Sequence, residues 1–408
     1  MPLPQCPTPF SALLLRDACT CPLCVHPSTN QRLFSTADIP PSIHRYTPSH
    51  STSIPVSALR KLRDTGALPV SRLDPYGKNC AELWGKERLE LRDFPYDEYM
   101  GDESVLYDLM RQLNRWGLAF VTGCPGEETA LRGIARRMGP IKDTFYGETW
   151  DVRTVPQAIN AAYTSHDLGF HTDLLYFQHP PHIQLLHCIQ LASTGGASVF
   201  ADAYKAAIDL FHSDPDAFEI LATVPVNYHY NHPNDNVYRT TKPVIDLHPL
   251  RINGTVYTSL AAYKRDWHAA SLAAGGPGWT DDMLVSCMDK IKWGPPFLAP
   301  FSQHETSTHA LPRAEPDETA LAALNAKVAR WHDAARKFNG FLQRDEYLYE
   351  RKMKPGECVL FDNTRTLHSR RAFEAQDVGG PRWLRGTYVD KDPYFSKMRV
   401  LEGKFGRK

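Results

Sequence analysis

The chain has 408 residues, and its 42% hydrophobic and 23% charged content is typical of a globular protein with a sizeable core. Lys plus Arg and Asp plus Glu both number 46, so no net basic charge is available to collect nucleic acid. No apolar run approaches the roughly 20 residues that cross a bilayer, and the first residues lack the pattern of a signal peptide. We therefore expect no nucleic acid partner, no membrane, and a cytoplasmic location with a mitochondrial one as the alternative.

The N-terminal part is rich in Pro, Ser and Thr and contains Cys19, Cys21 and Cys24. Clustered cysteines in an intracellular chain indicate metal or redox chemistry. A small unit that buries little apolar surface usually needs a bound metal or a covalent cross-link for stability. We expect residues 1–95 to form a small metal-binding domain and linker, and residues 96–408 to form a larger domain. The six scattered cysteines are interpreted as small buried apolar residues.

The larger part opens with helical patterns. Asp102 is placed to begin a helix in which Leu106, Leu109, Met110 and Leu113 recur at helical spacing, and residues 117–123 follow as a strand. A second helix carries Leu131, Ile134 and Met138 on one face and ends at Gly139.

The rest of the chain is predicted to be mainly strand, with helices in between. The Lys354-Pro355-Gly356 turn predicts a hairpin between two of the strands. This order favours a β barrel or sandwich with helical insertions over alternating βαβ units. The predicted strands are 182–190, 197–202, 226–231, 254–260, 346–352, 357–362 and 384–390, and the predicted helices are 203–222, 280–291 and 317–340.

A metal site is indicated by His171-Thr172-Asp173, because residues i and i+2 of a strand project to the same face. His368 follows much later, in the segment DNTRTLHSRRAF, and Arg382 and Tyr388 come after it. Two His and one carboxylate on one face, with open positions beside them, form the facial triad of non-haem Fe(II) oxygenases. A buried Arg can clamp the far carboxylate of a chelating oxo acid bidentately.

These segments, together with HPPHIQLLHCIQLASTGGASVF and PRWLRGTYVD, resemble the γ-butyrobetaine dioxygenase branch of the Fe(II)/2-oxoglutarate oxygenases. The resemblance implies a double-stranded β-helix (jelly-roll) catalytic domain in which His171, Asp173 and His368 bind iron. It implies that Arg382, assisted by Ser198, binds the 2-oxoglutarate co-substrate. It also implies dioxygen and a small-molecule prime substrate as reactants, and a homodimer.

The same resemblance implies a box of aromatic faces for a trimethylammonium group, which cannot donate hydrogen bonds. The matching positions carry Tyr146, Trp150, Tyr163 and Tyr388. Asn160 stands where the butyrobetaine enzymes hold the substrate carboxylate, which favours a carboxylate without an α-ammonium. Against this, residues 294–296 are Gly-Pro-Pro where the animal enzymes carry an Asn-rich stretch, so no side-chain amide is offered there.

The N-terminal segment LRDACTCPLC resembles the zinc motif of that branch. A tetrahedral zinc site needs a fourth ligand besides Cys19, Cys21 and Cys24, and His50 is the best match, with His44 in reserve. We expect this zinc to be structural.

Three functions follow as hypotheses. The first is hydroxylation of γ-butyrobetaine, as in carnitine biosynthesis, or of a close trimethylammonium carboxylate. The second is a related dioxygenase that acts on another substrate, either in specialised metabolism or as a trimethyllysine hydroxylase. The third is a binding protein without activity, which is disfavoured because every iron and co-substrate ligand is present.

Overall fold

The computed structural model describes residues 81–153, 166–191, 194–301, 318–373 and 382–406, and near the N-terminus residues 19, 21–29, 31–35, 37, 39 and 59. The chain divides into two compact units, residues 1–73 and residues 74–408. The assignment of residues 1–95 to a zinc-binding domain and linker stays a prediction. In the described part of the chain, no helix is both long and apolar enough to cross a membrane.

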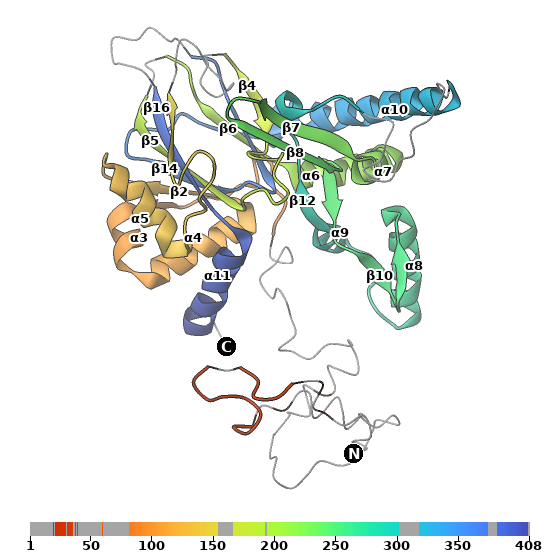
Figure 1. The fold of residues 1–408 in the computed structure, drawn as a ribbon, viewed down its shortest axis with the longest axis horizontal. Helices are drawn as coiled ribbons and strands as arrows, with labels where there is room; N and C mark the ends of the chain where they lie inside the picture. Colours follow the sequence, from red (N-terminus) through yellow and green to blue (C-terminus); the bar gives the residue numbers. More distant parts are fainter. Residues whose placement is uncertain are drawn as a thin grey trace. The chain divides into compact units, whose positions relative to one another are not determined.

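The larger unit is built around two sheets (Figure 1). All their strand pairs are antiparallel except β1 with β2, which run parallel. The six-stranded sheet has the order β1 (Asp93–Pro95), β2 (Leu118–Thr122), β14 (Cys358–Asp362), β5 (Ile183–Gln190), β16 (Trp383–Val389) and β3 (Trp150–Arg153). The four-stranded sheet has the order β13 (Leu348–Arg351), β6 (Ser198–Asp202), β15 (Thr366–Arg370) and β4 (Leu168–His171).

The two sheets pack face to face through large apolar side chains. Phe200 of β6 lies 6.3 Å from Phe120 of β2 and 5.6 Å from Phe361 of β14, measured between ring centroids. Successive residues of a strand point to opposite faces, so every second position of β2 and β14 faces this inner core. The alternate positions face the helices outside. This alternation also decides which residues can reach a site between the sheets.

Helices cover the outer face of each sheet (Figure 1). Helix α4 begins as the sequence predicts, because the Asp102 side chain accepts a hydrogen bond from the Ser104 backbone N–H at 2.7 Å. The helices on the six-stranded sheet are α3 (Tyr96–Gly101), α4 (Glu103–Trp116), α5 (Glu128–Met138) and α11 (Lys391–Phe405). Those beside the four-stranded sheet are α6 (Ala203–Ser213), α7 (Pro215–Thr223) and α10 (Glu318–Leu342).

The remaining elements form smaller hairpins and an insertion. In Figure 1, α8 and the β10–β11 hairpin project away from the two sheets. These elements are β7 (Val226–His232) paired with β8 (Asn236–Lys242), β9 (Ile245–Leu247) with β12 (Met288–Ile291), β10 (Leu250–Ile252) with β11 (Thr255–Tyr257), the helices α8 (Leu260–Ala273) and α9 (Asp281–Cys287), and the short helical turns η5 (Pro295–Phe297) and η6 (Asp345–Tyr347).

Three local predictions were wrong. The helix expected over 203–222 is two helices, because Pro215 has no N–H to continue the first and Asp214 caps the second. The helix expected over 280–291 ends at Cys287, where the chain becomes a strand paired with β9. The strands on either side of the turn at 354–356 do not form a hairpin, since β13 pairs with β6 while β14 pairs with β2 and β5. That turn carries the chain from one sheet to the other.

Candidate active site

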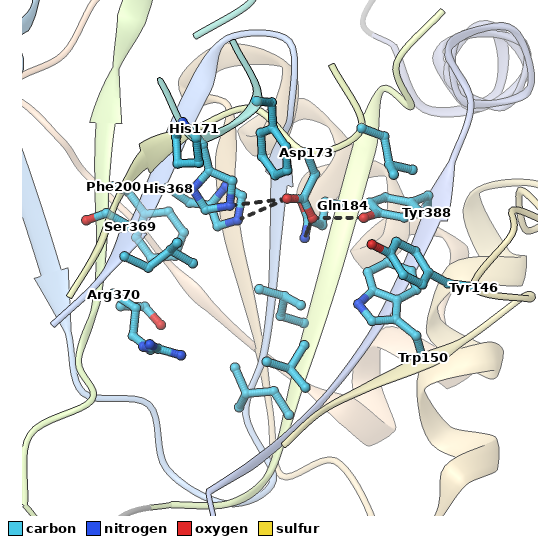
Figure 2. A pocket seen from close by; sticks show the side chains of 18 of the residues that line it. Tyr146, Trp150, His171, Asp173, Gln184, Phe200, His368, Ser369, Arg370 and Tyr388 are labelled. Atoms are coloured by element: carbon cyan, nitrogen blue, oxygen red, sulfur yellow. Dashed lines mark hydrogen bonds and ion pairs between the residues drawn. The ribbon is translucent and has the colours of Figure 1, made fainter. Parts of the chain in front are cut away.

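The three side chains predicted to bind iron lie together between the sheets (Figure 2). His171 ends β4 and His368 lies on β15, and the two residues are direct partners in the antiparallel pairing. The Asp173 Oδ1 atom lies 3.2 Å from His171 Nε2 and 3.9 Å from His368 Nε2. The candidate ligand atoms of all three residues lie within 4.8 Å of one another.

The route by which Asp173 reaches this site differs from the predicted one. Strand β4 stops at His171, and Asp173 lies in the turn that follows, so alternation along a strand does not place it. The next residue, Leu174, has φ 53°, a left-handed conformation that is uncommon for a residue with a side chain. Such an outlier beside a cluster of potential ligands is typical of a functional turn.

The protonation states suit a divalent metal. The His171 Nδ1 atom lies 2.9 Å from the Gly169 carbonyl oxygen, and donation to that oxygen leaves the Nε2 lone pair facing Asp173. Burial, reinforced by the neighbouring His171, lowers the pKa of His368 to about 3, so its imidazole is neutral at pH 7. Burial opposes ionisation of Asp173, but the adjacent imidazoles of His171 and His368 and a hydrogen bond from the Tyr388 hydroxyl hold the pKa of this carboxyl well below its usual range. Two imidazoles and one ionised carboxylate are the donor set of an Fe(II) facial triad.

Two buried arginines, Arg370 and Arg382, line the same pocket. Among the described residues, Arg382 has no ion-pair partner, and burial together with the nearby Arg370 lowers its pKa to about 10. The Arg370 Nη2 atom donates to the His166 carbonyl oxygen at 2.6 Å, and burial lowers the Arg370 pKa to about 10 as well. Both guanidinium groups lie over the Phe373 ring, at 4.9 Å and 5.6 Å from its centroid. Because a buried charge without a counter-ion, here that of Arg382, is costly, this end of the pocket fits an anionic ligand.

The opposite side of the pocket is aromatic (Figure 2). The Trp150 and Tyr388 rings stack with centroids 4.2 Å apart, and Tyr146 lies 6.0 Å from Trp150. Trp150 can lie flat on β16 because Gly386 has no side chain, and a Cβ there would lie 2.4 Å from the indole. Two stacked rings leave no space for a ligand between them, so these residues form one continuous wall.

Several predicted residues lie outside the described part of the chain: Asn160, Tyr163, His44 and His50. Ser198 does line the pocket, at the start of β6 and directly paired with Arg370 of β15. In the N-terminal unit, Cys19, Cys21 and Cys24 are buried and their sulfur atoms lie within 4.8 Å of one another. Three gathered thiols match three of the four ligands of a structural zinc site.

The model of the taurine catabolism dioxygenase TauD, TfdA family matches residues 74–388 of the chain. This chain belongs to the TauD, TfdA family.

Three dioxygenases are similar to this chain over nearly its whole length. The dioxygenase str8 of Strobilurus tenacellus is 31% identical, covering 95% of this chain and 84% of that protein. The γ-butyrobetaine dioxygenase of Pseudomonas sp. strain AK-1 is 27% identical over 97% of this chain and 91% of its own. The mitochondrial trimethyllysine dioxygenase of Bos taurus is 25% identical, with 96% and 82% covered. The chain is therefore an Fe(II)- and 2-oxoglutarate-dependent dioxygenase of the branch that contains these enzymes.

The geometry shows what each part of this TauD-family pocket can do. Bound Fe(II) and 2-oxoglutarate supply the oxidising chemistry, in which dioxygen is consumed, the co-substrate is decarboxylated and a C–H bond is hydroxylated. His171, Asp173 and His368 present the donor atoms for the metal on one face of the pocket. The arginine end can fix a carboxylate, and the aromatic wall can place a substrate and exclude water.

The pocket lining also includes residues that sequence reasoning missed, among them Tyr176, Gln184, Phe297 and Arg370. Gln184 could have been found, because it is a polar residue on the face of strand β5 that also carries the inward-facing Leu186 and Cys188. Arg370 follows His368 by two residues on the same strand, so strand alternation directs both to the pocket side. Tyr176 and Phe297 could not be found in this way, since one lies in a turn and the other in η5, and only tertiary folding brings these two segments together.

Proposed function

We propose that this dioxygenase hydroxylates γ-butyrobetaine or a close trimethylammonium carboxylate. The observation that carries the proposal is a single pocket with the candidate triad in its middle, a cationic end at Arg370 and Arg382, and an aromatic wall opposite. In this proposal the two facing sheets form a double-stranded β-helix, and His171, Asp173 and His368 hold the iron. Arg382, with Ser198 nearby, binds the far carboxylate of 2-oxoglutarate.

The aromatic wall supports the proposal that the substrate carries a cationic group. A trimethylammonium group gains about 0.5 to 2 kcal/mol from the face of an aromatic ring, and indole presents the best face. Trp150 is stacked with Tyr388 and lines the pocket, so the part of the indole that faces the pocket is available to a ligand. The wall therefore binds a cation through one broad surface, with Tyr163 as a further ring in our proposal.

One observation favours the second candidate, a dioxygenase acting on a different substrate. Pro296 and Phe297 line the pocket, and η5 offers no amide or hydroxyl to a substrate carboxylate. At the aromatic side, the described lining residues provide no cation to pair with such a carboxylate. A more apolar substrate would suit this surface as well, as long as Asn160 does not act as the carboxylate partner.

A substrate panel separates the two candidates. Purified protein is supplied with Fe(II), 2-oxoglutarate and dioxygen, and succinate release is followed with γ-butyrobetaine, with trimethyllysine and without a prime substrate. The proposal expects the fastest release, coupled to a hydroxylated product, with γ-butyrobetaine. Equal succinate release in all three reactions would contradict the proposed substrate but would not contradict the reaction class.

We further propose that Cys19, Cys21, Cys24 and His50 hold one structural zinc ion. Three gathered, buried sulfurs support this, and a closed tetrahedral site leaves no position open for catalysis. Metal analysis of protein purified without chelator is expected to find one zinc per chain, and Cys21→Ser is expected to lose it and to lower the melting temperature. Cys124→Ser, which changes a buried thiol outside the cluster, is the matched control and should retain the zinc. Zinc-free wild-type protein would rule the site out.

A further inference from the structure

The two carboxylate oxygens of Asp173 have different surroundings. Oδ1 faces the imidazoles of His171 and His368, at 3.2 Å and 3.9 Å from their Nε2 atoms. Oδ2 points the other way and accepts two hydrogen bonds, from Gln184 Nε2 at 2.6 Å and from the Tyr388 hydroxyl at 2.8 Å. One oxygen is thus left for a metal while the other is occupied by protein donors.

The two donors are fixed to each other by the sheet. Gln184 of β5 and Tyr388 of β16 are direct partners in the antiparallel pairing, and each side chain is about 1% exposed. The pair therefore presents two hydrogen-bond donors from adjacent strands of a buried sheet to a single acceptor. The amide must turn its nitrogen toward Asp173, because an amide oxygen there would repel the carboxylate.

The backbone of Asp173 is held as firmly. Its N–H donates to Asn363 Oδ1 at 2.8 Å, and Asn363 Nδ2 donates in return to the Asp173 carbonyl oxygen at 3.0 Å. Asn363 is fully buried and lies directly after β14. With main chain and side chain both fixed, the carboxylate has little freedom to rotate about its last bond.

This arrangement has a consequence for the number of open metal positions. Carboxylates bind metals through one oxygen or through both, and a second bound oxygen would fill a position that a facial triad keeps open. We propose that Gln184 and Tyr388 are positioning residues that keep Asp173 a one-oxygen ligand and so preserve the position that 2-oxoglutarate needs. The inference rests on the iron site of the proposed function. It gives Tyr388 a second role besides its ring, which is part of the aromatic wall.

The test distinguishes the role of the Tyr388 hydroxyl from that of its ring. It also distinguishes an effect on Fe(II) binding from an effect on 2-oxoglutarate binding. Tyr388→Phe keeps the ring and removes one donor, and Gln184→Met keeps the approximate shape and removes the other. Tyr394→Phe is the matched control, because it also removes a buried hydroxyl, one that donates to the Met110 carbonyl oxygen away from the pocket. For each protein, Fe(II) affinity is measured anaerobically by calorimetry. Affinity of the Fe(II)-loaded protein for 2-oxoglutarate is then measured from the visible charge-transfer absorption of the chelate.

Substitution of residues behind a metal ligand typically changes affinity or activity about 10- to 100-fold. We expect Tyr388→Phe and Gln184→Met to weaken 2-oxoglutarate binding about tenfold or more while Fe(II) affinity changes much less, and Tyr394→Phe to change neither. Unchanged 2-oxoglutarate binding in both variants would overturn the inference, and so would a parallel loss of Fe(II) and 2-oxoglutarate, which marks a merely structural role. Failure of wild-type protein to bind Fe(II) would instead overturn the proposed iron site.

Discussion

The two sides of the pocket are built by different forces. Around Asp173, directed hydrogen bonds from the paired strands β5 and β16 and from Asn363 fix individual atoms. At the aromatic side, the rings of Tyr146, Trp150 and Tyr388 pack against one another without directed polar contacts between them. Directed polar contacts fail abruptly when one atom is removed, whereas a packed surface loses its function gradually. The pocket thus joins a precise metal side to a tolerant substrate side.

The largest effect is expected at the precise side. Asp173→Ala should abolish turnover, because it removes the only anionic group among the three candidate ligands. Succinate release and bound iron are measured together with the melting temperature, which reports whether the fold is kept. Asp143→Ala, at an exposed carboxylate outside the pocket, is the control and should behave as wild type. Retention of more than a few per cent of activity by Asp173→Ala would show that the triad is assigned wrongly.

The second largest effect is expected at the arginine end of the pocket. Arg382→Ala is expected to raise the KM for 2-oxoglutarate roughly 10- to 150-fold, which corresponds to the about 1.5 to 3 kcal/mol of a charged hydrogen bond. The KM for the prime substrate should change little, since the lost contact holds the co-substrate alone. Arg371→Ala serves as the control, because Arg371 is half-exposed and pairs with Glu350 outside the pocket. An equal rise in both KM values would mean that Arg382 has a structural role.

The metal side could be predicted from sequence because its chemistry limits the residue types. A facial triad needs two His and one carboxylate, which a His-x-Asp sequence and a distant His can provide. His171, Asp173 and His368 could therefore be named in advance as residues that lie together. The physical reason was only partly right, since Asp173 is placed by a turn and by Asn363 and not by strand alternation.

Most strands were predicted from their apolar runs. Which strand pairs with which was not predicted. The pairing of β13 with β6 instead of β14 depends on contacts between residues about 150 positions apart, and a turn sequence carries no information about them. The aromatic side was predicted through resemblance alone. Tyr176 and Phe297 are ordinary aromatic residues in sequence, and only the closeness of their rings, 5.4 Å between centroids, reveals that they belong together.

A smaller effect is expected at Gly386, which packs against the aromatic wall. A Cβ at this position would lie 2.4 Å from the Trp150 ring, so Gly386→Ala must displace the indole or the strand. Overpacking of this kind costs about 1 to 3 kcal/mol of stability, and chemical denaturation measures it. Gly340→Ala in α10 has no atom within 4 Å of the new Cβ and should be neutral or slightly stabilising. If both variants have the same stability as wild type, Trp150 is not packed on β16 as described.

The smallest effect is expected from the aromatic wall itself, and it decides the substrate. Trp150→Leu keeps an apolar side chain and removes one π face, so it should weaken binding of a trimethylammonium substrate by about 0.5 to 2 kcal/mol, or roughly 2- to 30-fold in KM. Binding of 2-oxoglutarate should be spared, and Trp267→Leu, in the projecting helix α8, should leave both unchanged. The sharper comparison uses a substrate with a tert-butyl group in place of the trimethylammonium group, because this keeps the shape and removes only the charge. Wild-type protein should prefer the charged compound, and Trp150→Leu should reduce that preference. If wild type turns over both compounds equally well, the wall is merely an apolar surface, and an enzyme acting on a different, uncharged substrate becomes the better proposal.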